Sequence, residues 1–413
     1  MSLLSPLIDE LQEALIIRLE EKANTEILTR ELLLPHLEEL IVQNQRAGKL
    51  SPSDRTELLN QVLYRVLGLG PLEPLLTDSA ITEIMVNGRQ AVFIERDGKL
   101  EKTGIVFSRD EDILHIINRI VARVGRRIDE SSPLVDARLP DGSRVNAVIP
   151  PLSQVGPVLT IRRFPSKVLQ VEELVARGTL SKPMADFLRA VILAKQNLII
   201  SGSTGAGKTS TLNALAALVP SDERLITIED TAEIRLTHPH LVSLESRPPN
   251  VEGAGEVTIR TLLKNALRMR PDRIIIGEVR GGEALDMLQA MNTGHQGSLT
   301  TVHANAPAEA LLRMETMALM ADVELPLLAI REQIKSAVHY VLQQERLPDG
   351  TRRIVEIGEM ALRSDTNEKF SYTMLPLFKF DKVSGQFKAM GTKPERIQMF
   401  LEAGITVDNE WFR

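Results

Sequence analysis

One glycine-rich segment constrains the fold of this 413-residue chain more than any other feature. Residues 202–209 read Gly-Ser-Thr-Gly-Ala-Gly-Lys-Thr. The segment directly follows the apolar run Asn197–Ser201, which is typical of a buried strand, and it directly precedes the helix-favouring run Ser210–Ala217. A strand that turns through closely spaced glycines into a helix is typical of the phosphate-binding loop of α/β proteins.

The residue types in this loop suit a bound polyphosphate. Glycines let backbone N–H groups curve around a β-phosphate at a helix N-terminus, while Lys208 can neutralise β- and γ-phosphate oxygens. The Thr209 hydroxyl is suited to bind Mg²⁺. The sequence therefore predicts a site for ATP and Mg²⁺. Its predicted binding residues are Ser203, Thr204, Gly205, Ala206, Gly207, Lys208, Thr209 and Ser210.

Polar residues follow each of three further strand-like runs. Glu229, Glu278 and His303 come directly after the apolar stretches or within one residue of them. Those stretches lie at 225–228, 273–276 and 298–302. In open α/β sheets ligands bind beyond the carboxyl ends of the strands, so we expect these three side chains to face the bound phosphates. A carboxylate there can hold Mg²⁺ or orient the attacking water, and a histidine can hydrogen-bond the γ-phosphate.

The pattern along the chain predicts an α/β protein of several parts. Strand-like and helical runs alternate after Met184, which predicts a mainly parallel sheet with helices on both faces. The segments before it read as a helical bundle, then a smaller α+β domain, then a linker between two prolines. The predicted boundaries are 1–70 for the bundle, 71–165 for the α+β domain, 166–183 for the linker and 184–413 for the C-terminal domain with an extension.

Arginine is enriched in the α+β segment. Residues 112–163 contain eight arginines, no lysine and five acidic residues. The planar guanidinium suits phosphate oxygens, and a domain outside the phosphate loop is where an arginine finger would originate. Arg138, Arg144 and Arg162 are the better candidates, because they lie at a turn and at a strand end. For any one of them, a structural ion pair is an equally good interpretation.

Composition excludes several classes of site. The chain has no cysteine, which rules out disulfides, thiolate zinc sites and cysteine nucleophiles. A formal charge of −6 gives no general attraction to nucleic acid or anionic lipid. The chain begins without a basic segment followed by an apolar one, and no stretch approaches the roughly 20 apolar residues that span a bilayer. We therefore expect a cytoplasmic protein that is neither exported nor membrane-spanning.

Four motifs in order resemble the type II/type IV secretion ATPase superfamily, most closely the TadA/CpaF branch that serves Tad-type pili. They are a Walker A motif at 202–209, an Asp box at 226–233, a Walker B motif at 273–281 and a His box at 294–305. The segment Gly68–Asp78 leading to Asn87-Gly88 resembles the entry to the N-terminal domain of that branch, and the tetracysteine zinc module of many pilus ATPases is absent. The resemblance covers residues 68–345.

The resemblance implies a RecA-like C-terminal domain behind a PAS-like α+β domain. It also implies a homo-hexameric ring with ATP between these domains, and N-terminal arginines that reach the phosphates. Such a ring would dock onto an integral inner-membrane platform protein, so the chain would lie peripherally at the cytoplasmic face of that membrane. Its work would be the assembly or retraction of a pilus, or protein secretion.

The same resemblance assigns roles to single residues. Glu229 and Glu278 become the water-orienting and Mg²⁺-linked carboxylates, and their division of labour stays open because Gly277 stands where many ATPases have aspartate. The remaining expected catalytic residues are His295, His303, Arg270 and Arg280. Residues 346–413 match no pattern that indicates a role.

Two other functions fit a RecA-like ring. A nucleic-acid translocase or helicase would show activity stimulated by nucleic acid, but aromatic residues are only 3% of the chain and no basic-aromatic groove is evident. We therefore expect no nucleic-acid partner. A ring that binds ATP without turnover is the other alternative, and the intact Lys208, Thr209, Glu229 and Glu278 argue against it.

Overall fold

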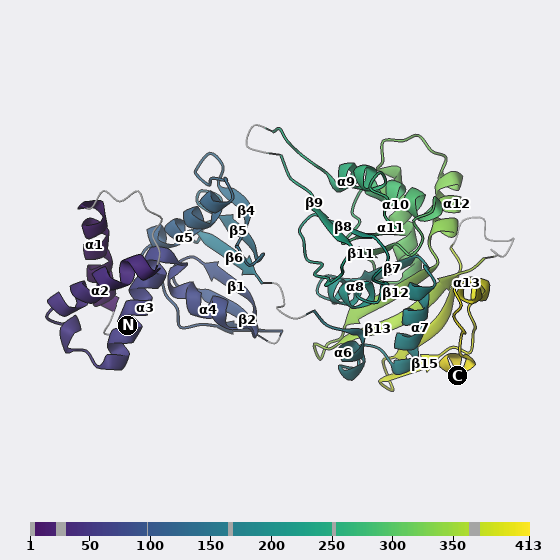
Figure 1. The fold of residues 1–413 in the computed structure, drawn as a ribbon, viewed down its shortest axis with the longest axis horizontal. Helices are drawn as coiled ribbons and strands as arrows, with labels where there is room; N and C mark the ends of the chain where they lie inside the picture. Colours follow the sequence, from purple (N-terminus) through teal and green to yellow (C-terminus); the bar gives the residue numbers. More distant parts are fainter. Residues whose placement is uncertain (1–4, 22–29, 97, 164–167, 250–252, 363–371) are drawn as a thin grey trace. The chain divides into compact units, whose positions relative to one another are not determined.

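The computed structural model describes residues 5–21, 30–96, 98–163, 168–249, 253–362 and 372–413 (Figure 1). The chain divides into two compact units, residues 1–166 and 167–413. The first unit contains two separate hydrophobic cores, one among its N-terminal helices and one beneath a sheet. The second unit is built on one larger sheet with a core on each face.

The N-terminal helices pack through leucines that recur at helical spacing. Leu11, Leu15, Leu33, Leu37 and Leu58 are buried in their shared core. The third helix begins where proline occupies its first turn and the preceding serine caps it. The helices are α1 (Ser5–Glu21), α2 (Arg30–Gln43) and α3 (Pro52–Leu67). None of the helices in the described part of the chain is long and apolar enough to cross a bilayer.

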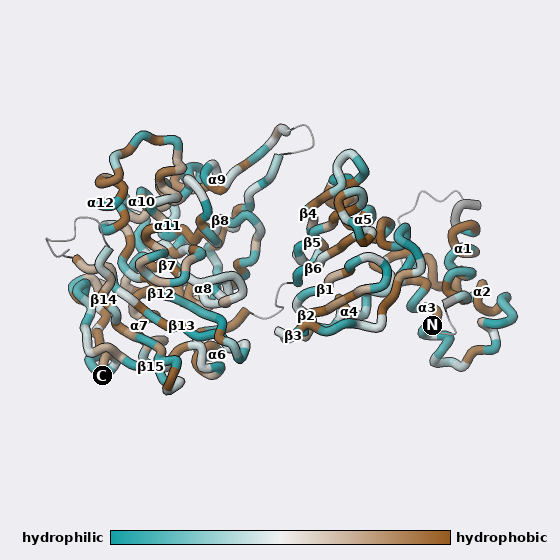
Figure 2. Tube along the Cα trace, turned by 180° about the vertical axis from the view of Figure 1, so that it is seen from behind, coloured by the Kyte–Doolittle hydropathy of each residue, from teal (hydrophilic) through white to brown (hydrophobic). Residues whose placement is uncertain are grey.

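A six-stranded antiparallel sheet with strand order β3-β2-β1-β6-β5-β4 completes the first unit. Helix α5 covers one face, because its Ile113, Ile117 and Ile120 are buried in one core with residues of the strands. Figure 2 shows hydrophobic (brown) stretches in α5 and in the strands of this sheet. The elements are α4 (Glu73–Thr77), α5 (Asp110–Arg123), β1 (Ile81–Asn87), β2 (Val92–Arg96), β3 (Lys99–Lys102), β4 (Leu134–Arg138), β5 (Arg144–Val148) and β6 (Val158–Arg162). The residues that point to the opposite face are partly or fully exposed.

The second unit contains a nine-stranded sheet in the order β15-β14-β13-β12-β7-β11-β10-β8-β9. The strands from β12 to β9 pair in parallel, and β13, β14 and β15 add antiparallel pairs at the other side. The strands are β7 (Leu198–Gly202), β8 (Leu225–Glu229), β9 (Leu241–Glu245), β10 (Arg273–Ile276), β11 (Leu299–Val302), β12 (Tyr340–Arg346), β13 (Arg352–Met360), β14 (Met374–Asp381) and β15 (Gln386–Ala389). This is a mixed α/β architecture.

Helices cover both faces of this sheet (Figure 1). Alternate residues of β7 enter the two cores: Leu198 and Ile200 join α6, α7 and α8, while Ile199 joins the helices from α9 to α12. The helices are α6 (Val171–Ala176), α7 (Lys182–Leu193), α8 (Lys208–Ala216), α9 (Ile259–Ala266), α10 (Glu283–Asn292), α11 (Pro307–Leu319), α12 (Leu327–Ala337) and α13 (Ile397–Glu402).

One segment differs from the sequence prediction. The stretch 166–183, interpreted as a linker, contains α6, whose Val171 and Leu174 are buried in the core of the second unit. Pro183 does not interrupt the helix, because it lies in the first turn of α7, and Ser181 is the N-cap of that helix. The C-terminal stretch after residue 346 is part of the same core, since Phe378, Phe400 and Phe412 surround Phe187.

Candidate active site

The glycine-rich loop joins β7 to α8 at the carboxyl edge of the larger sheet. Gly207 has a φ of 96°, in the left-handed region that favours glycine, and it caps α8 without a side-chain hydrogen bond. A Cβ on Gly202 would lie 2.3 Å from the carbonyl oxygen of Gln344. The backbone N–H groups of the first turn of α8 therefore face the loop without a competing side-chain cap, which suits an anion.

Lys208 lies inside this loop and is only 8% exposed. Its Nζ donates to the carbonyl oxygens of Gly202 at 3.0 Å and Ser203 at 3.2 Å. Burial lowers the pKa of the Lys208 ammonium, and the nearby Glu278 carboxylate opposes that shift. The ammonium is thus held by neutral carbonyls at the position where a phosphate would supply negative charge.

His303 connects Lys208 to Glu278. Its Nδ1 lies 3.3 Å from Lys208 Nζ, and its Nε2 lies 2.9 Å from Glu278 Oε1. An ammonium can only donate, so Nδ1 accepts and the ring proton sits on Nε2, from which it is donated to the carboxylate. Burial, followed by the Lys208 charge, lowers the pKa of His303, which favours the neutral imidazole that this pattern requires.

Glu278 follows β10 and is the centre of this charged group. Burial raises the pKa of its carboxyl, but the hydrogen bond and charge of Arg280, together with the charge of Lys208, outweigh burial and lower it overall. Arg280 NH2 lies 2.8 Å from Glu278 Oε2, and its NH1 lies 3.9 Å from Asp230. Glu278 is therefore a carboxylate at neutral pH.

Glu229 ends β8 in a different environment. Its carboxylate accepts backbone N–H groups from Glu233 at 2.9 Å and from Ile234 at 3.1 Å. Its Cγ would lie 2.8 Å from a Cβ placed on Gly277. The Glu229 side chain thus occupies the space that a larger residue at position 277 would need. Its hydrogen bonds stabilise the turn that follows β8.

Oxygen donors suited to Mg²⁺ are present beside the loop. Thr209 begins the first turn of α8, and Glu278 supplies an ionised carboxylate from β10. No cluster of three or more histidine, aspartate or glutamate residues within the described ranges could hold a metal alone. That arrangement fits Mg²⁺, which binds through one or two protein oxygens, waters and substrate phosphates.

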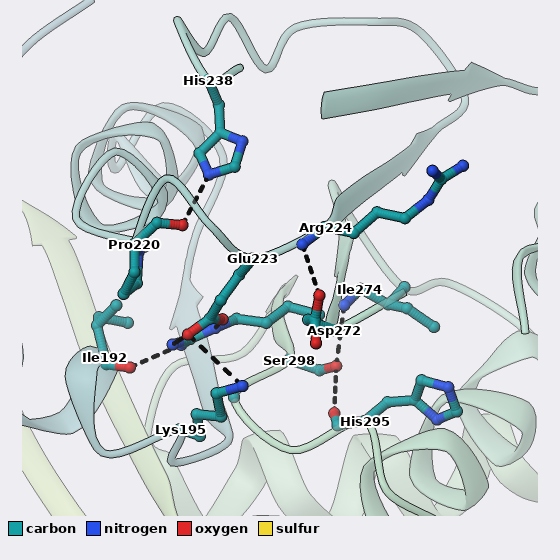
Figure 3. Close-up of polar contacts among 12 residues, drawn as sticks. Ile192, Lys195, Pro220, Glu223, Arg224, His238, Asp272, Ile274, His295 and Ser298 are labelled. Atoms are coloured by element: carbon teal, nitrogen blue, oxygen red, sulfur yellow. Dashed lines mark hydrogen bonds and ion pairs between the residues drawn. The ribbon is translucent and has the colours of Figure 1, made fainter. Parts of the chain in front are cut away.

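His295 and Arg270 lie at the opposite edge of the sheet. His295 precedes β11, and its carbonyl oxygen accepts from the Ser298 hydroxyl at 2.7 Å (Figure 3). Arg270 precedes β10 in an exposed turn with a φ of 56°. Only residues that follow a parallel strand reach its carboxyl edge, so within one protomer neither residue joins the phosphate loop.

Charged side chains lie at this amino edge, and Figure 3 shows Glu223 and Lys195 among them. Arg273 is fully buried, with its Nε 2.5 Å from a Glu223 oxygen and its NH1 2.6 Å from the carbonyl oxygen of Ile192. Lys195 adds a second cation, 3.5 Å from Glu223. These contacts are structural, because they satisfy buried groups beneath the sheet.

The three candidate arginines of the first unit form one row. Arg138 pairs with Arg144 across β4 and β5, and Arg144 pairs with Arg162 across β5 and β6. In each strand the buried residues alternate with them, so all three project from the face opposite the core. Three guanidinium groups on one face make this row a candidate anion site.

Sequence reasoning missed residues that reach the loop from elsewhere. Glu233 contributes charge to Lys208 and Arg280. Gln344 of β12 accepts from the Thr211 hydroxyl at 2.8 Å, and Arg352 of β13 donates to the carbonyl oxygen of Gly205 at 3.1 Å. Glu233 lies inside the Asp box, but no local pattern marks Gln344 or Arg352.

Comparisons with known proteins agree with this geometry. The family model for type II/IV secretion system proteins matches residues 66–356. The conjugal transfer protein TrbB of Rhizobium radiobacter is 35% identical over 68% of this chain and 84% of its own length. The type IV secretion system protein PtlH of Bordetella pertussis is 34% identical over 70% of this chain and 93% of its own length.

Among solved structures, the pilus retraction motor PilT with bound ADP has the same fold. It superposes with a TM-score of 0.51 over 72% of this chain and 84% of its own, at 18% identity. The family match extends from the end of the N-terminal helices through the phosphate loop into β13, so it includes the sheet of the first unit and the parallel strands of the larger sheet. This chain belongs to the type II/IV secretion system protein family.

Proposed function

We propose that this chain is a Mg²⁺-dependent ATPase that converts ATP hydrolysis into movement within a secretion or pilus machine. The observation that carries the proposal is the convergence of Lys208, His303 and Glu278 beside an open glycine loop at the carboxyl edge of the sheet. The loop would bind the phosphates through backbone N–H groups and Lys208. Bound Mg²⁺ would neutralise charge on the β- and γ-phosphates.

The two carboxylates divide the work in this proposal. Glu278 is ionised and one hydrogen bond from His303, so it orients the attacking water or a water bound to the metal. Glu229 is occupied by backbone N–H groups and positions the turn at the end of β8. His303, hydrogen-bonded between Lys208 and Glu278, is placed to report loss of the γ-phosphate.

Arginines from outside the loop supply further positive charge. The row Arg138, Arg144 and Arg162 is suited to phosphate oxygens because three guanidinium groups project from one face. Arg280 already binds Glu278 and is the cation nearest that carboxylate. We propose that the row acts on the phosphates of a bound nucleotide.

The proposal places the chain in a homo-hexameric ring, with RecA-like and PAS-like domains, that docks on an integral inner-membrane platform protein at the cytoplasmic face. Support comes from the family match and from relatives named for conjugal transfer, type IV secretion and pilus retraction. Among these machines we propose a Tad-type pilus, because the segment Gly68–Asp78 leading to Asn87-Gly88 resembles the entry to the N-terminal domain of that branch and the chain lacks the tetracysteine module of many pilus ATPases.

The test is steady-state ATPase activity of the purified chain against protein concentration, with and without single-stranded DNA. Specific activity that rises as the ring assembles and ignores DNA is the expected result, because the motor acts on protein partners. Stimulation by DNA would instead support a nucleic-acid translocase. Activity that is independent of concentration while sedimentation shows a monomer would contradict the ring.

A further inference from the structure

The hairpin of β12 and β13 borders the phosphate loop on the side away from β11. Gln344 of β12 is the parallel partner of Gly202, at the point where β7 enters the loop. Further along the hairpin, Arg346 and Arg352 stand directly opposite each other as its last pair. The end of the hairpin therefore lies beside the loop. The hydrogen bond from Thr211 to Gln344 joins residues that are more than 130 positions apart in the sequence.

Two side chains of the hairpin contact the loop. Arg352 Nε donates to the carbonyl oxygen of Gly205 at 3.1 Å. A Cβ placed on Gly207 would lie 2.9 Å from Arg352 Cδ and 3.1 Å from Gln344 Nε2. Gln344 in turn accepts from the Thr211 hydroxyl at 2.8 Å, in the first turns of α8. The hairpin thus fixes the carbonyl orientation at Gly205 and approaches the loop closely at Gly207.

The charge at this end of the hairpin favours an anion. Arg346 and Arg352 are directly opposed, so two guanidinium groups originate at the same end of the hairpin. Arg346 NH1 lies 3.9 Å from the position of a Cβ on Gly205, so both guanidinium groups are next to the loop. A polyphosphate held by the loop would attract these guanidinium groups at close range.

We propose that Arg352 and Arg346 form a further nucleotide-binding element, with Arg352 positioning the loop through Gly205 and Arg346 adding positive charge beside the phosphates. This inference rests on the proposed function, since it requires that the loop bind a nucleotide. It assigns a role to the C-terminal hairpin, whose outer residues match no motif. The hairpin pairs with β7 on one side and with β14 on the other. Nucleotide bound at the loop would therefore contact an element that connects the parallel and antiparallel parts of the sheet.

Arg353 is a matched control on the same strand. Its NH1 donates to the carbonyl oxygen of Arg177 at 3.1 Å, and its guanidinium lies 3.5 Å from the position of a Cβ on Gly178. Its side chain therefore contacts the segment after α6 and not the phosphate loop. Arg353→Gln removes the same charge from the neighbouring position and keeps both Arg346 and Arg352.

The experiment measures the dissociation constants of fluorescent ADP and of inorganic triphosphate for the full chain and its variants. Arg352→Gln should weaken ADP binding about tenfold through loss of a cation and its loop contact, with KM for ATP rising more than kcat falls. Arg346→Gln should weaken triphosphate and ADP binding about threefold, and Arg353→Gln less than about twofold. Arg352→Lys should recover part of the affinity, because it restores charge without the planar fork.

The folding of each variant is checked by urea unfolding followed through the fluorescence of Trp411, the one tryptophan of the chain, which packs against the core of the second unit. If wild type and Arg352→Gln bind ADP equally well, this inference is overturned and the proposed function stands. Equal losses in Arg352→Gln and Arg353→Gln would also overturn it, since a general charge effect would then suffice. Wild type that binds neither ligand would overturn the proposed function as well.

Discussion

The two edges of the parallel sheet carry the same residue types in opposite environments. At the carboxyl edge, His303 and Glu278 have side chains that are 31% and 20% exposed, and their contacts converge on Lys208. At the amino edge, Arg273 is fully buried and its partner Glu223 is 10% exposed. Charged groups at the carboxyl edge are accessible to a ligand. Charged groups at the amino edge bind each other and stabilise the sheet.

The difference teaches that position relative to a strand decides the role of a polar residue. A buried, fully hydrogen-bonded ion pair has no capacity left for a ligand, whereas a partly exposed one can exchange a partner for phosphate or water. The two edges should therefore respond to mutation in different observables, stability at one and turnover at the other.

The largest expected effect on folding stability lies at the amino edge. Glu223→Gln removes the charge that balances buried Arg273 and should lower the free energy of unfolding by about 3 kcal/mol. Urea unfolding monitored by Trp411 fluorescence measures it, and Asp222→Asn on the adjacent exposed residue is the control. A loss below about 1 kcal/mol would show that the pair is not the anchor of this edge.

Glu278→Gln should produce the next effect, at the carboxyl edge. We expect kcat to fall about 100-fold, which corresponds to about 2.7 kcal/mol, because the amide cannot serve as a base or hold a cation as the carboxylate does. ADP affinity and unfolding should change little. Glu229→Gln is the comparison variant, and a larger loss of kcat in Glu229→Gln would reverse the roles proposed for the two carboxylates.

His339 gives the amino edge a pH dependence. The residue is buried, its Nδ1 accepts from the Asn197 N–H at 3.1 Å, and burial lowers its pKa to about 3. An unfolded histidine has a pKa of about 6.5, so between about pH 6.5 and pH 3 the unfolded chain binds a proton at this residue and the folded chain does not. The free energy of unfolding therefore falls as the pH falls. The loss should reach about 2 kcal/mol between pH 7 and pH 5.

The check is to compare unfolding of wild type and His339→Gln at both pH values. The variant has no imidazole there to titrate, so the part of the pH dependence that His339 contributes should disappear whatever its stability at pH 7. An unchanged difference between the two pH values would assign the acid sensitivity to other groups.

The smallest effect should come from the histidine at the amino edge. His295→Ala should change kcat by less than about twofold, since within one protomer the residue lies on the far side of the sheet from the loop. The measurement is steady-state ATPase activity at a concentration where the ring is assembled. A loss above about tenfold would mean that this edge completes a site in a neighbouring subunit.

Much of the carboxyl edge could be predicted from the sequence because local order encodes it. A glycine loop after an apolar run, and polar residues after three more runs, suffice to place Lys208, Glu278 and His303 at one edge. Arg270 and His295 belong to matching motifs but precede their strands, so within one protomer they lie away from the loop, and their catalytic roles stay predictions.

Other features depend on pairings that no local pattern reveals. Arg352 reaches the loop only because β12 pairs with β7 and β13 with β12. The arginine row requires the registers of three strands, which the composition of the segment cannot supply. Residues 171–176 seemed part of a linker because flanking prolines dominate their neighbourhood, yet Val171 and Leu174 provide enough apolar surface to anchor a short helix.

The central claim is that the loop at the carboxyl edge binds and hydrolyses ATP. Steady-state ATPase activity of wild type and Lys208→Ala, at equal concentrations of folded protein verified by Trp411 fluorescence, tests it most directly. The account predicts turnover in wild type and a loss of at least about 1,000-fold in Lys208→Ala, because the buried ammonium faces the phosphates. Equal turnover in the two proteins would contradict it.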